Sequence, residues 1–372
     1  MKILLATMSM DIGGAETHIL ELALELLKRG HEVYLASNGG EYIPVLEKAG
    51  VKICTAPLNS NHPIKMFKSY RILDKLIKEQ NFDLVHSHSR ISSFVLGHLQ
   101  RKYHFPFVTS DHGAFKVTML LKAMTNWGDV TLAVSNDLKE YLMNNYNVPE
   151  DNIIVTVNGI DTEKFNKEAD FKDVLEELSL KEDSFKIVHV SRMDNETVFV
   201  TKQLIKIAPR LAEKIPDLEI IIVGDGTAFE EIKRLSNEAN EQCKRNVIKL
   251  AGKRTDIYKF DNMASIFVGV SRATLEAMSC EKLVIVAGSE GFLGYLDDNN
   301  LEDAIKTNFT CRGLGLSTEE MLLDSVLEGY KHYIEHDEAQ MAKNRALVAN
   351  NYSIKRMCDD AEKAYEKCLK KA

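Results

Sequence analysis

The sequence predicts an α/β fold with two doubly wound parallel sheets, and three observations lead to this prediction. Apolar stretches of strand length alternate with amphipathic helical stretches, which is the pattern of a parallel sheet. A chain of 372 residues exceeds one ordinary core, so two domains are expected. The turn-forming pair Asn158 and Gly159, followed by a polar run over residues 166–183, separates two halves that both show the alternation.

The expected domains are residues 1–165 and 166–352, followed by a final helix within 353–372. In the first half, strands are expected at 3–7, 32–36, 51–54, 84–86, 107–109, 130–134 and 153–157, with helices at 15–29 and 63–78. In the second half, strands are expected at 186–190, 218–223, 247–250, 265–270 and 283–287, with helices at 198–214, 228–239 and 271–280, a loop at 288–294 and the last helix at 354–370.

Composition excludes several classes of protein. A net charge of −8 argues against nucleic acid as a partner, because such proteins bind largely through contacts with phosphates. The six cysteines show no paired spacing, so neither a zinc cluster nor a disulfide framework is expected. No apolar run reaches the roughly 18 residues of a membrane span, and the amino terminus does not have the pattern of a signal peptide. A cytoplasmic protein is therefore expected.

Glycines precede predicted helices at two strand ends. Gly13 and Gly14 stand just before the first helix, and Gly224 follows the strand at 218–223. Backbone amides at such a turn can approach a phosphate or a sugar hydroxyl, and a helix amino end favours an anion. A tight turn without any ligand fits the same spacing. These glycines are candidate substrate-binding positions with a structural alternative.

Charged side chains stand at neighbouring strand ends of the second half. Arg192 and Lys253 each follow a strand, and a guanidinium at such a place could clamp a phosphate. Glu276 lies in the opening turns of the helix at 271–280, where its carboxylate could bind a ribose diol or merely complement the helix dipole. Arg192, Gly224, Lys253 and Glu276 therefore converge on the sheet edge where open α/β sheets bind ligands.

Three histidines follow strands in the first half. His86 and His88 flank Ser87, and His112 precedes Gly113. A histidine at the carboxyl end of a strand could reach a ligand as a hydrogen-bond donor or as an acid or base. Metal binding by the His86 and His88 pair is not favoured, since no third ligand stands at a telling spacing. No metal is expected.

The predicted helix at 63–78 is basic and amphipathic. It carries lysines and an arginine on one side and Ile64, Phe67 and other apolar residues between them. Such a helix can make peripheral contact with an anionic membrane. A core helix with a solvated basic face has much the same sequence, and this second interpretation is favoured.

Seven short motifs follow one another at fitting intervals. They are Gly13-Gly14-Ala15-Glu16, His112-Gly113, Val134-Ser135, Asn158-Gly159-Ile160-Asp161 with Phe165, Ser191-Arg192, Gly224-Asp225-Gly226 and Leu275-Glu276-Ala277-Met278. With them the chain resembles the retaining GT-B glycosyltransferases of family four over nearly its whole length. The resemblance implies two Rossmann-like domains that face a central cleft, with the last helix returning to the first domain.

The resemblance also implies roles for individual residues. The second domain would bind a nucleotide-sugar donor, with Arg192 at the diphosphate and Glu276 at the ribose. The first domain would lie on the acceptor side, and His112 would contact the transferred sugar. Asn158 joins the glycines among the expected substrate-binding residues. Members of the family usually need neither metal nor cofactor, because basic side chains and helix amino ends neutralise the leaving diphosphate.

Two features of the family are missing. The first of its two glutamates would fall at Val268 or Gly269, and the lysine that usually follows the diphosphate arginine is absent. Lys253 or Arg254 could supply the lost positive charge. Glu290 and Gly291, which follow the strand at 283–287, could approach the sugar instead, so Glu290 is counted with His112 and Arg192 as a catalytic candidate.

The predicted function is retaining transfer of a sugar from a UDP- or GDP-type donor to a cell-surface glycan or a lipid-linked acceptor. A nucleotide-sugar epimerase with the same two-domain architecture is an alternative. A non-catalytic partner subunit that lost part of its donor site is another, and the missing glutamate and lysine motivate it.

Overall fold

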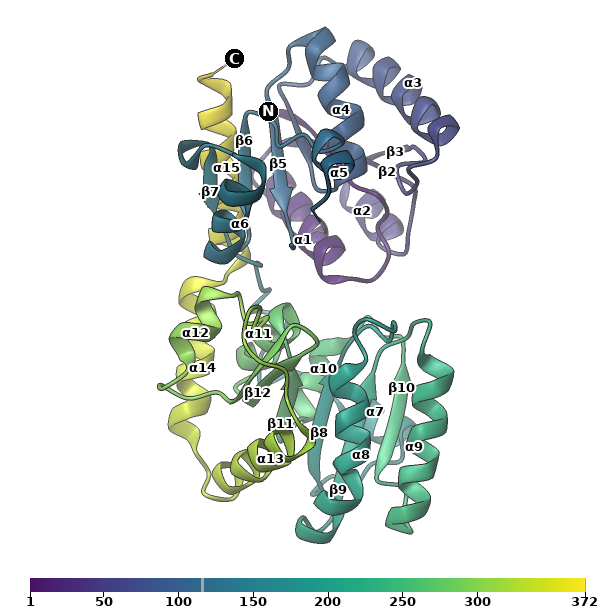
Figure 1. The fold of residues 1–372 in the computed structure, drawn as a ribbon, viewed down its shortest axis with the longest axis vertical. Coiled ribbons are helices and arrows are strands. Elements are labelled where there is room, and N and C mark those ends of the chain that lie inside the picture. Colours follow the sequence, from purple (N-terminus) through teal and green to yellow (C-terminus); the bar gives the residue numbers. More distant parts are fainter. Residues whose placement is uncertain (115–116, 372) are drawn as a thin grey trace. The chain divides into compact units, whose positions relative to one another are not determined.

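The computed structural model describes residues 1–114 and 117–371 and divides the chain into two compact units. The first unit comprises Met1–Gly159 together with Ser353–Ala372, and the second comprises Ile160–Tyr352. Each unit is built around its own sheet (Figure 1). The chain therefore crosses from one unit to the other twice.

Parallel strands form the sheet of the first unit. They are β1 (Lys2–Ala6), β2 (Glu32–Ser37), β3 (Lys52–Thr55), β4 (Leu84–Ser87), β5 (Phe107–Asp111), β6 (Val130–Ala133) and β7 (Ile153–Val155). Over the described residues the order is β3-β2-β1-β4-β5-β6-β7. The strand order reverses at β1, which is where doubly wound sheets bind ligands beyond their carboxyl ends.

Helices cover both faces of this sheet. They are α1 (Gly14–Lys28), α2 (Ile43–Ala49), α3 (Pro63–Gln80), α4 (Arg90–Tyr103), α5 (Met119–Ala123), α6 (Asn136–Tyr146) and α15 (Ile354–Leu369), and a 3-10 turn lies at Glu150–Asn152. Leu4 and Ala6 pack in one core with side chains of α3 and α4. Ile3 and Leu5 alternate with them onto the other face and are also fully buried.

The sheet of the second unit contains β8 (Phe185–Val190), β9 (Leu218–Val223), β10 (Ile248–Gly252), β11 (Ile266–Gly269), β12 (Leu283–Gly288) and β13 (Gly291–Tyr295). Its order in the part of the chain described is β10-β9-β8-β11-β12-β13. The helices are α7 (Lys172–Glu177), α8 (Phe199–Lys214), α9 (Phe229–Cys243), α10 (Ile257–Met263), α11 (Ser271–Ser279), α12 (Leu301–Lys306), α13 (Glu319–Ile334) and α14 (Glu338–Asn351).

The prediction of a loop over 288–294 was wrong, because β13 begins at Gly291 and pairs antiparallel with β12. Ser289 and Glu290 alone connect the two strands as a tight hairpin. Glycine suggested a loop, yet here it permits close packing: a Cβ at Gly291 would lie 2.0 Å from the carbonyl oxygen of Cys311.

The junction after the first unit lies at Gly159, six positions before the boundary expected after residue 165. Residues 160–165 belong with the second unit because side chains of that unit hold their carbonyl groups. Arg345 donates to the carbonyl oxygens of Thr162 at 2.9 Å and Phe165 at 2.8 Å, and the Ser279 hydroxyl also donates to Phe165, at 2.7 Å.

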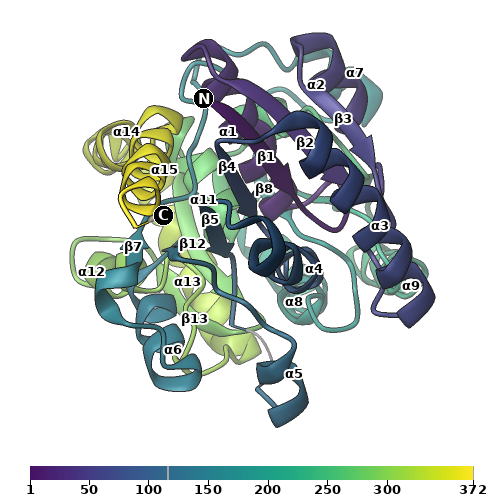
Figure 2. The ribbon, with the colours of Figure 1, turned by 90° about the horizontal axis from the view of Figure 1, so that it is seen from above.

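The last helix, α15, is part of the first unit and lies beside β6 and β7 (Figure 1 and Figure 2). The Tyr365 hydroxyl and His86 Nδ1 are 2.8 Å apart in the interior. Arg29, which directly follows α1, donates to the Asp359 carboxylate at 2.7 Å. A side chain at Gly159 would collide with the α15 backbone, since its Cβ would lie 2.8 Å from the Cα of Ile354.

Candidate functional site

Strand ends of the second sheet bring the candidate residues to one edge. Neighbouring strands from β10 to β12 are all parallel, so their carboxyl ends lie at the same side. Arg192 follows β8, Gly224 follows β9, Lys253 follows β10, Glu276 lies in α11 after β11, and Glu290 with Gly291 follows β12. The structure therefore groups the predicted residues of this unit along a single sheet edge.

Arg272, which the sequence analysis did not single out, is the most unusual side chain at this edge. It is only 6% exposed, and its Nε donates to Glu276 Oε1 at 2.8 Å. Nη1 and Nη2 are buried and have no hydrogen-bond partner among the described residues. Burying unpaired donors of a charged group costs free energy, which a bound anion would recover. Arg272 is therefore a ready receptor for a phosphate or carboxylate.

Glu276 pairs with Arg272 through one carboxylate oxygen and keeps the other oxygen as a hydrogen-bond acceptor. Burial raises the pKa of its carboxyl above the ordinary value, and the charge and hydrogen bond of Arg272 oppose that rise. Only Oε1 is engaged; Oε2 has no hydrogen-bond partner in the described part of the chain. One carboxylate oxygen can thus accept a hydrogen bond from a hydroxyl group while the other holds the guanidinium.

The backbone before Arg272 is strained. Ser271 has a φ of 55°, in the left-handed region that a serine seldom occupies. Val270 holds the N-cap position, and Ser271 is the first residue of α11. The sharp turn between β11 and α11 places Arg272 in the first turn of α11, directly after the strand end.

Two glycines allow neighbouring turns to approach closely. A Cβ at Gly224, where φ is 140°, would lie 1.9 Å from the carbonyl oxygen of Ser191. A Cβ at Gly226 would lie 2.5 Å from the carbonyl carbon of Met193. The turn after β9 therefore packs onto the turn that carries Arg192. Gly224 gains a structural role, and its predicted contact with substrate stays a prediction.

The remaining basic side chains at this edge differ in their availability. Arg192 is exposed, and its guanidinium has no ion-pair or hydrogen-bond partner within residues 1–114 and 117–371. Lys253 is exposed as well. Arg254 is bound by Asp256 at 2.9 Å and by Glu177 at 2.6 Å. The charge of Arg254 is therefore already neutralised by these two carboxylates.

Glu290 lies exposed in the hairpin turn between β12 and β13. Arg312 Nη2 approaches its Oε2 at 3.3 Å, and water screens this attraction on the glutamate side, where the side chain is 51% exposed. The carboxylate can therefore exchange this partner for a ligand at small cost. Its predicted catalytic role stays a prediction.

The first unit holds a second group of predicted residues, around the carboxyl ends of β1, β4 and β5. Gly14 is exposed, and no atom lies within 4 Å of where a Cβ would stand, whereas a Cβ at Gly13 would meet the Glu16 carboxylate at 2.3 Å. Open backbone at the amino end of α1 suits an anion or a hydroxyl group. Asn158 is buried near the end of this unit, next to Gly159.

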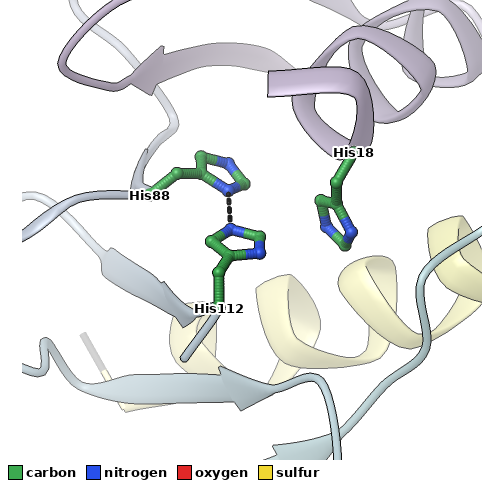
Figure 3. A group of neighbouring side chains, drawn as sticks. All are labelled: His18, His88 and His112. Carbon is green, nitrogen blue, oxygen red and sulfur yellow. Dashed lines mark hydrogen bonds between the residues drawn. The ribbon is translucent and has the colours of Figure 1, made fainter. Parts of the chain in front are cut away.

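Histidines gather beside this helix end. His88 Nδ1 and His112 Nε2 are 3.2 Å apart, and the ring of His18 from α1 lies 4.8 Å from that of His112, measured between centroids (Figure 3). Burial lowers the pKa of His112 to about 4 and that of His88 well below its ordinary value. These imidazoles are uncharged at neutral pH. His18 escaped the sequence analysis because it lies inside a helix and only the fold brings it here.

His86 has a structural role, unlike His88 and His112, with which it was grouped in the sequence. Its ring nitrogens pair at 2.8 Å with the Tyr365 hydroxyl and at 2.8 Å with the Ser110 hydroxyl. Both hydrogen-bonding positions are thus occupied inside the core. His86 joins β4 and β5 to α15 and offers nothing to a ligand.

Residues 12–164 match the family described as Glycosyltransferase Family 4, and residues 170–309 match the family described as Glycosyl transferases group 1. An Escherichia coli UDP-Gal:alpha-D-GlcNAc-diphosphoundecaprenol alpha-1,3-galactosyltransferase is 31% identical over 251 residues, 61% of this chain and 63% of that protein. A subunit of the human phosphatidylinositol N-acetylglucosaminyltransferase is 25% identical over 330 residues, 82% of this chain and 65% of that protein.

Solved structures resemble the whole chain. A glycosyltransferase from Rickettsia africae superposes with a TM-score of 0.79 at 22% identity, covering 100% of this chain and 99% of that one. Anabaena HepE in complex with UDP superposes with a TM-score of 0.75 at 16% identity, covering 99% and 100%. At such low identity the likeness concerns the fold, and the predicted GT-B fold is confirmed.

Proposed function

Because the chain belongs to the GT-B glycosyltransferases of the family-four type, we propose that it transfers a sugar from a UDP- or GDP-type donor to a glycan or lipid-linked acceptor, with retention and without a metal. The observation that carries the proposal is the buried guanidinium of Arg272, whose Nη1 and Nη2 lack partners among the described residues. A donor diphosphate is an anion that such a guanidinium can bind with two hydrogen bonds.

Nucleotide recognition is assigned to the neighbouring groups. Glu276 Oε2 accepts from a ribose hydroxyl, and exposed Arg192 adds a second positive charge beside the diphosphate. Arg272 thereby replaces the charge of the lysine that the family usually carries after the arginine. HepE, a structural neighbour at 17% identity, has been crystallised with UDP-glucose, which agrees with a nucleotide-sugar donor.

Chemistry rests on stabilising the departing diphosphate. Negative charge grows on the donor phosphate as the bond to the anomeric carbon breaks, and fixed guanidinium groups lower the energy of that transition state more than of the ground state. The acceptor hydroxyl is held on the face that the diphosphate leaves, which gives retention. His112, neutral because burial lowers its pKa to about 4, is assigned a single hydrogen bond to the transferred sugar.

The acceptor is assigned by relationship alone. The names of two relatives, the galactosyltransferase and the human protein, refer to a diphosphoundecaprenol-linked sugar and to phosphatidylinositol. Both substrates carry lipid chains. A lipid-linked acceptor therefore leads among acceptor classes for this chain.

A panel of nucleotide sugars tests the donor assignment. We expect one UDP- or GDP-sugar to bind measurably in calorimetric titration of the purified protein, and the Glu276→Gln variant to bind it about tenfold more weakly or worse, since a hydrogen bond to a charged group contributes about 1.5–3 kcal/mol. Absence of binding by every member of the panel would count against a transferase. Conversion of the donor to its epimer without an acceptor would favour the epimerase alternative.

Peripheral membrane contact is assigned to α3. Ile64 and Phe67 are 74% and 65% exposed near its start, beside exposed Lys65, Lys68 and Arg71. None of the helices in residues 1–114 and 117–371 is long and apolar enough to span a bilayer. Apolar side chains flanked by basic ones suit the interface of an anionic membrane.

Phe67→Asp is expected to weaken binding to vesicles that contain anionic lipid by about tenfold or more, because burying a phenylalanine contributes about 1.5–3 kcal/mol. Cosedimentation with vesicles measures the change. Val45→Asp in α2, at a position 49% exposed, serves as the matched control and should leave binding unchanged. Equal effects of the two substitutions would remove α3 as the contact.

A further inference from the structure

The first unit brings together three imidazole rings from separate elements (Figure 3). His18 lies in α1, His88 follows β4 and His112 follows β5. One nitrogen of each ring lies within 4.8 Å of the corresponding nitrogens of the other two. From this arrangement we propose that His18, His88 and His112 form a binding site for a divalent transition-metal ion, with Zn²⁺ as the ion that suits three imidazoles best.

The distances are close to those of a zinc site. Zinc binds histidine nitrogens at about 2.0–2.1 Å in a tetrahedron, which places the nitrogens roughly 3.4 Å from one another. His88 Nδ1 and His112 Nε2 are already 3.2 Å apart. His18 has to approach by about an ångström or a little more to reach the separation found in a zinc tetrahedron. The ion would thus be held between two preset rings and one that closes on it.

The rings also have the right chemistry. Metal ligation takes a lone pair on an imidazole nitrogen, and the cluster offers one such nitrogen from each of three rings. His88 is 5% exposed, and its Nε2 has no hydrogen-bond partner among the described residues. The His88 ring is thus held inside the protein, with Nδ1, the nitrogen that faces His112, as its ligand atom.

Sequence spacing did not indicate this site, because the metal prediction considered only His86 and His88. In the structure His86 is not a candidate ligand, because both of its ring nitrogens are hydrogen bonded. His18 takes the place of the third ligand. Three protein ligands leave a fourth position of the tetrahedron for water or a substrate atom.

Occupation of the site would oppose the reaction. If His112 contacts the transferred sugar, as the proposed function has it, an ion that takes its lone pair prevents that contact. The site is therefore inhibitory. This regulatory part rests on the proposed function, whereas metal binding itself can be measured without any substrate.

Binding is tested with chelator-treated full-length protein and Co²⁺, whose visible absorption reports nitrogen coordination, followed by competition with Zn²⁺. We expect one ion per chain and a loss of affinity of at least about 100-fold in His18→Ala, since even outer-sphere changes at metal sites cost 10–100-fold. His98→Ala, at an exposed position in α4 where Nδ1 lies 2.8 Å from the carbonyl oxygen of Phe94, is the control and should bind like the wild type.

Thermal unfolding supplies a second measurement, because an ion that binds only the folded protein raises the melting midpoint. Zn²⁺ should raise the midpoint of the wild type and of His98→Ala but not of His18→Ala. Should His18→Ala fail to fold, His88→Gln takes its place in both measurements. Wild-type protein without a Co²⁺ spectrum, or a His18 variant that binds as tightly as wild type, would overturn the site.

Inhibition is tested separately. Zn²⁺ should abolish transfer by the wild type, and a chelator should restore it, while His18→Ala, which keeps His112, should resist the ion. Tight metal binding with no effect on transfer would refute the inhibitory role, while the proposal of a metal site would stand. A protein that binds the metal but no nucleotide sugar would refute the transferase proposal alone.

Discussion

Replacing Arg272 by methionine should lower the affinity for UDP or GDP by roughly 100-fold, the largest effect expected of any single side chain at the donor edge. Two hydrogen bonds between a charged guanidinium and a phosphate contribute about 1.5–3 kcal/mol each, and 1.4 kcal/mol is tenfold in affinity. Methionine keeps much of the buried volume but none of the donors. Uridine or guanosine, which lack the diphosphate, should be affected less.

Arg192 provides the internal comparison. Its side chain is exposed, so its attraction for a phosphate is screened by water and salt, and Arg192→Met should cost less than Arg272→Met. Arg210→Met is the control, because that arginine lies in α8 and is paired with Glu320 at 2.6 Å. Calorimetric titration with UDP and GDP measures all three. A larger loss of affinity in Arg192→Met than in Arg272→Met would make Arg192 the main diphosphate-binding residue, as the resemblance to the family implies.

Loss of fold must be separated from loss of binding. Arg272→Met leaves the Glu276 carboxylate buried without its partner, and an uncompensated buried charge is strongly destabilising. The double variant Arg272→Met, Glu276→Leu removes both members of the pair, which is often tolerated. We expect the double variant to regain the melting midpoint without regaining affinity for UDP or GDP.

The fold was largely predictable because burial patterns in parallel sheets are plain in a sequence. The strand expected at 218–223 coincides with β9, since its residues are buried on both faces and all are apolar except Glu219. β13 was missed because its two glycines disfavour strands unless tight packing demands them. The helix predicted at 63–78 continues to Gln80, an error within the ordinary uncertainty of helix ends.

The donor site and the histidine cluster were predictable only in part, and for the same reason. Residues such as Arg192 and Glu276 stand directly after predicted strands, where topology alone brings them to a ligand-binding edge. Arg272 and His18 lie inside helices, where a charged or polar residue usually faces solvent. Their burial, and the groups they meet, depend on how elements pack in space. No spacing in the sequence encodes those contacts.

The helix α15 is expected to be indispensable for the first unit, although it is the last segment of the chain. Its buried residues are Met357, Cys358, Asp360, Ala361, Ala364, Tyr365 and Cys368. Burial of Tyr365 and of Met357 contributes about 1.5–3 kcal/mol each to the free energy of unfolding. The whole free energy of unfolding of a domain is only about 5–15 kcal/mol. A chain that ends at Tyr352 should therefore lose the cooperative unfolding of residues 1–159.

The single tryptophan makes this loss measurable, because Trp127 belongs to the first unit while circular dichroism reports helices of both units. In the shortened chain, the fluorescence transition of Trp127 should vanish and a dichroism transition should remain. Ending the chain at Lys370 keeps α15 and is the control. Tyr365→Phe should give a milder effect of about 1–3 kcal/mol, since it leaves His86 Nδ1 without its partner. The opposite result would be a cooperative Trp127 transition at the wild-type midpoint in the chain that ends at Tyr352. It would show that residues 1–159 fold without α15, because the sheet and its other helices hold a sufficient core of their own.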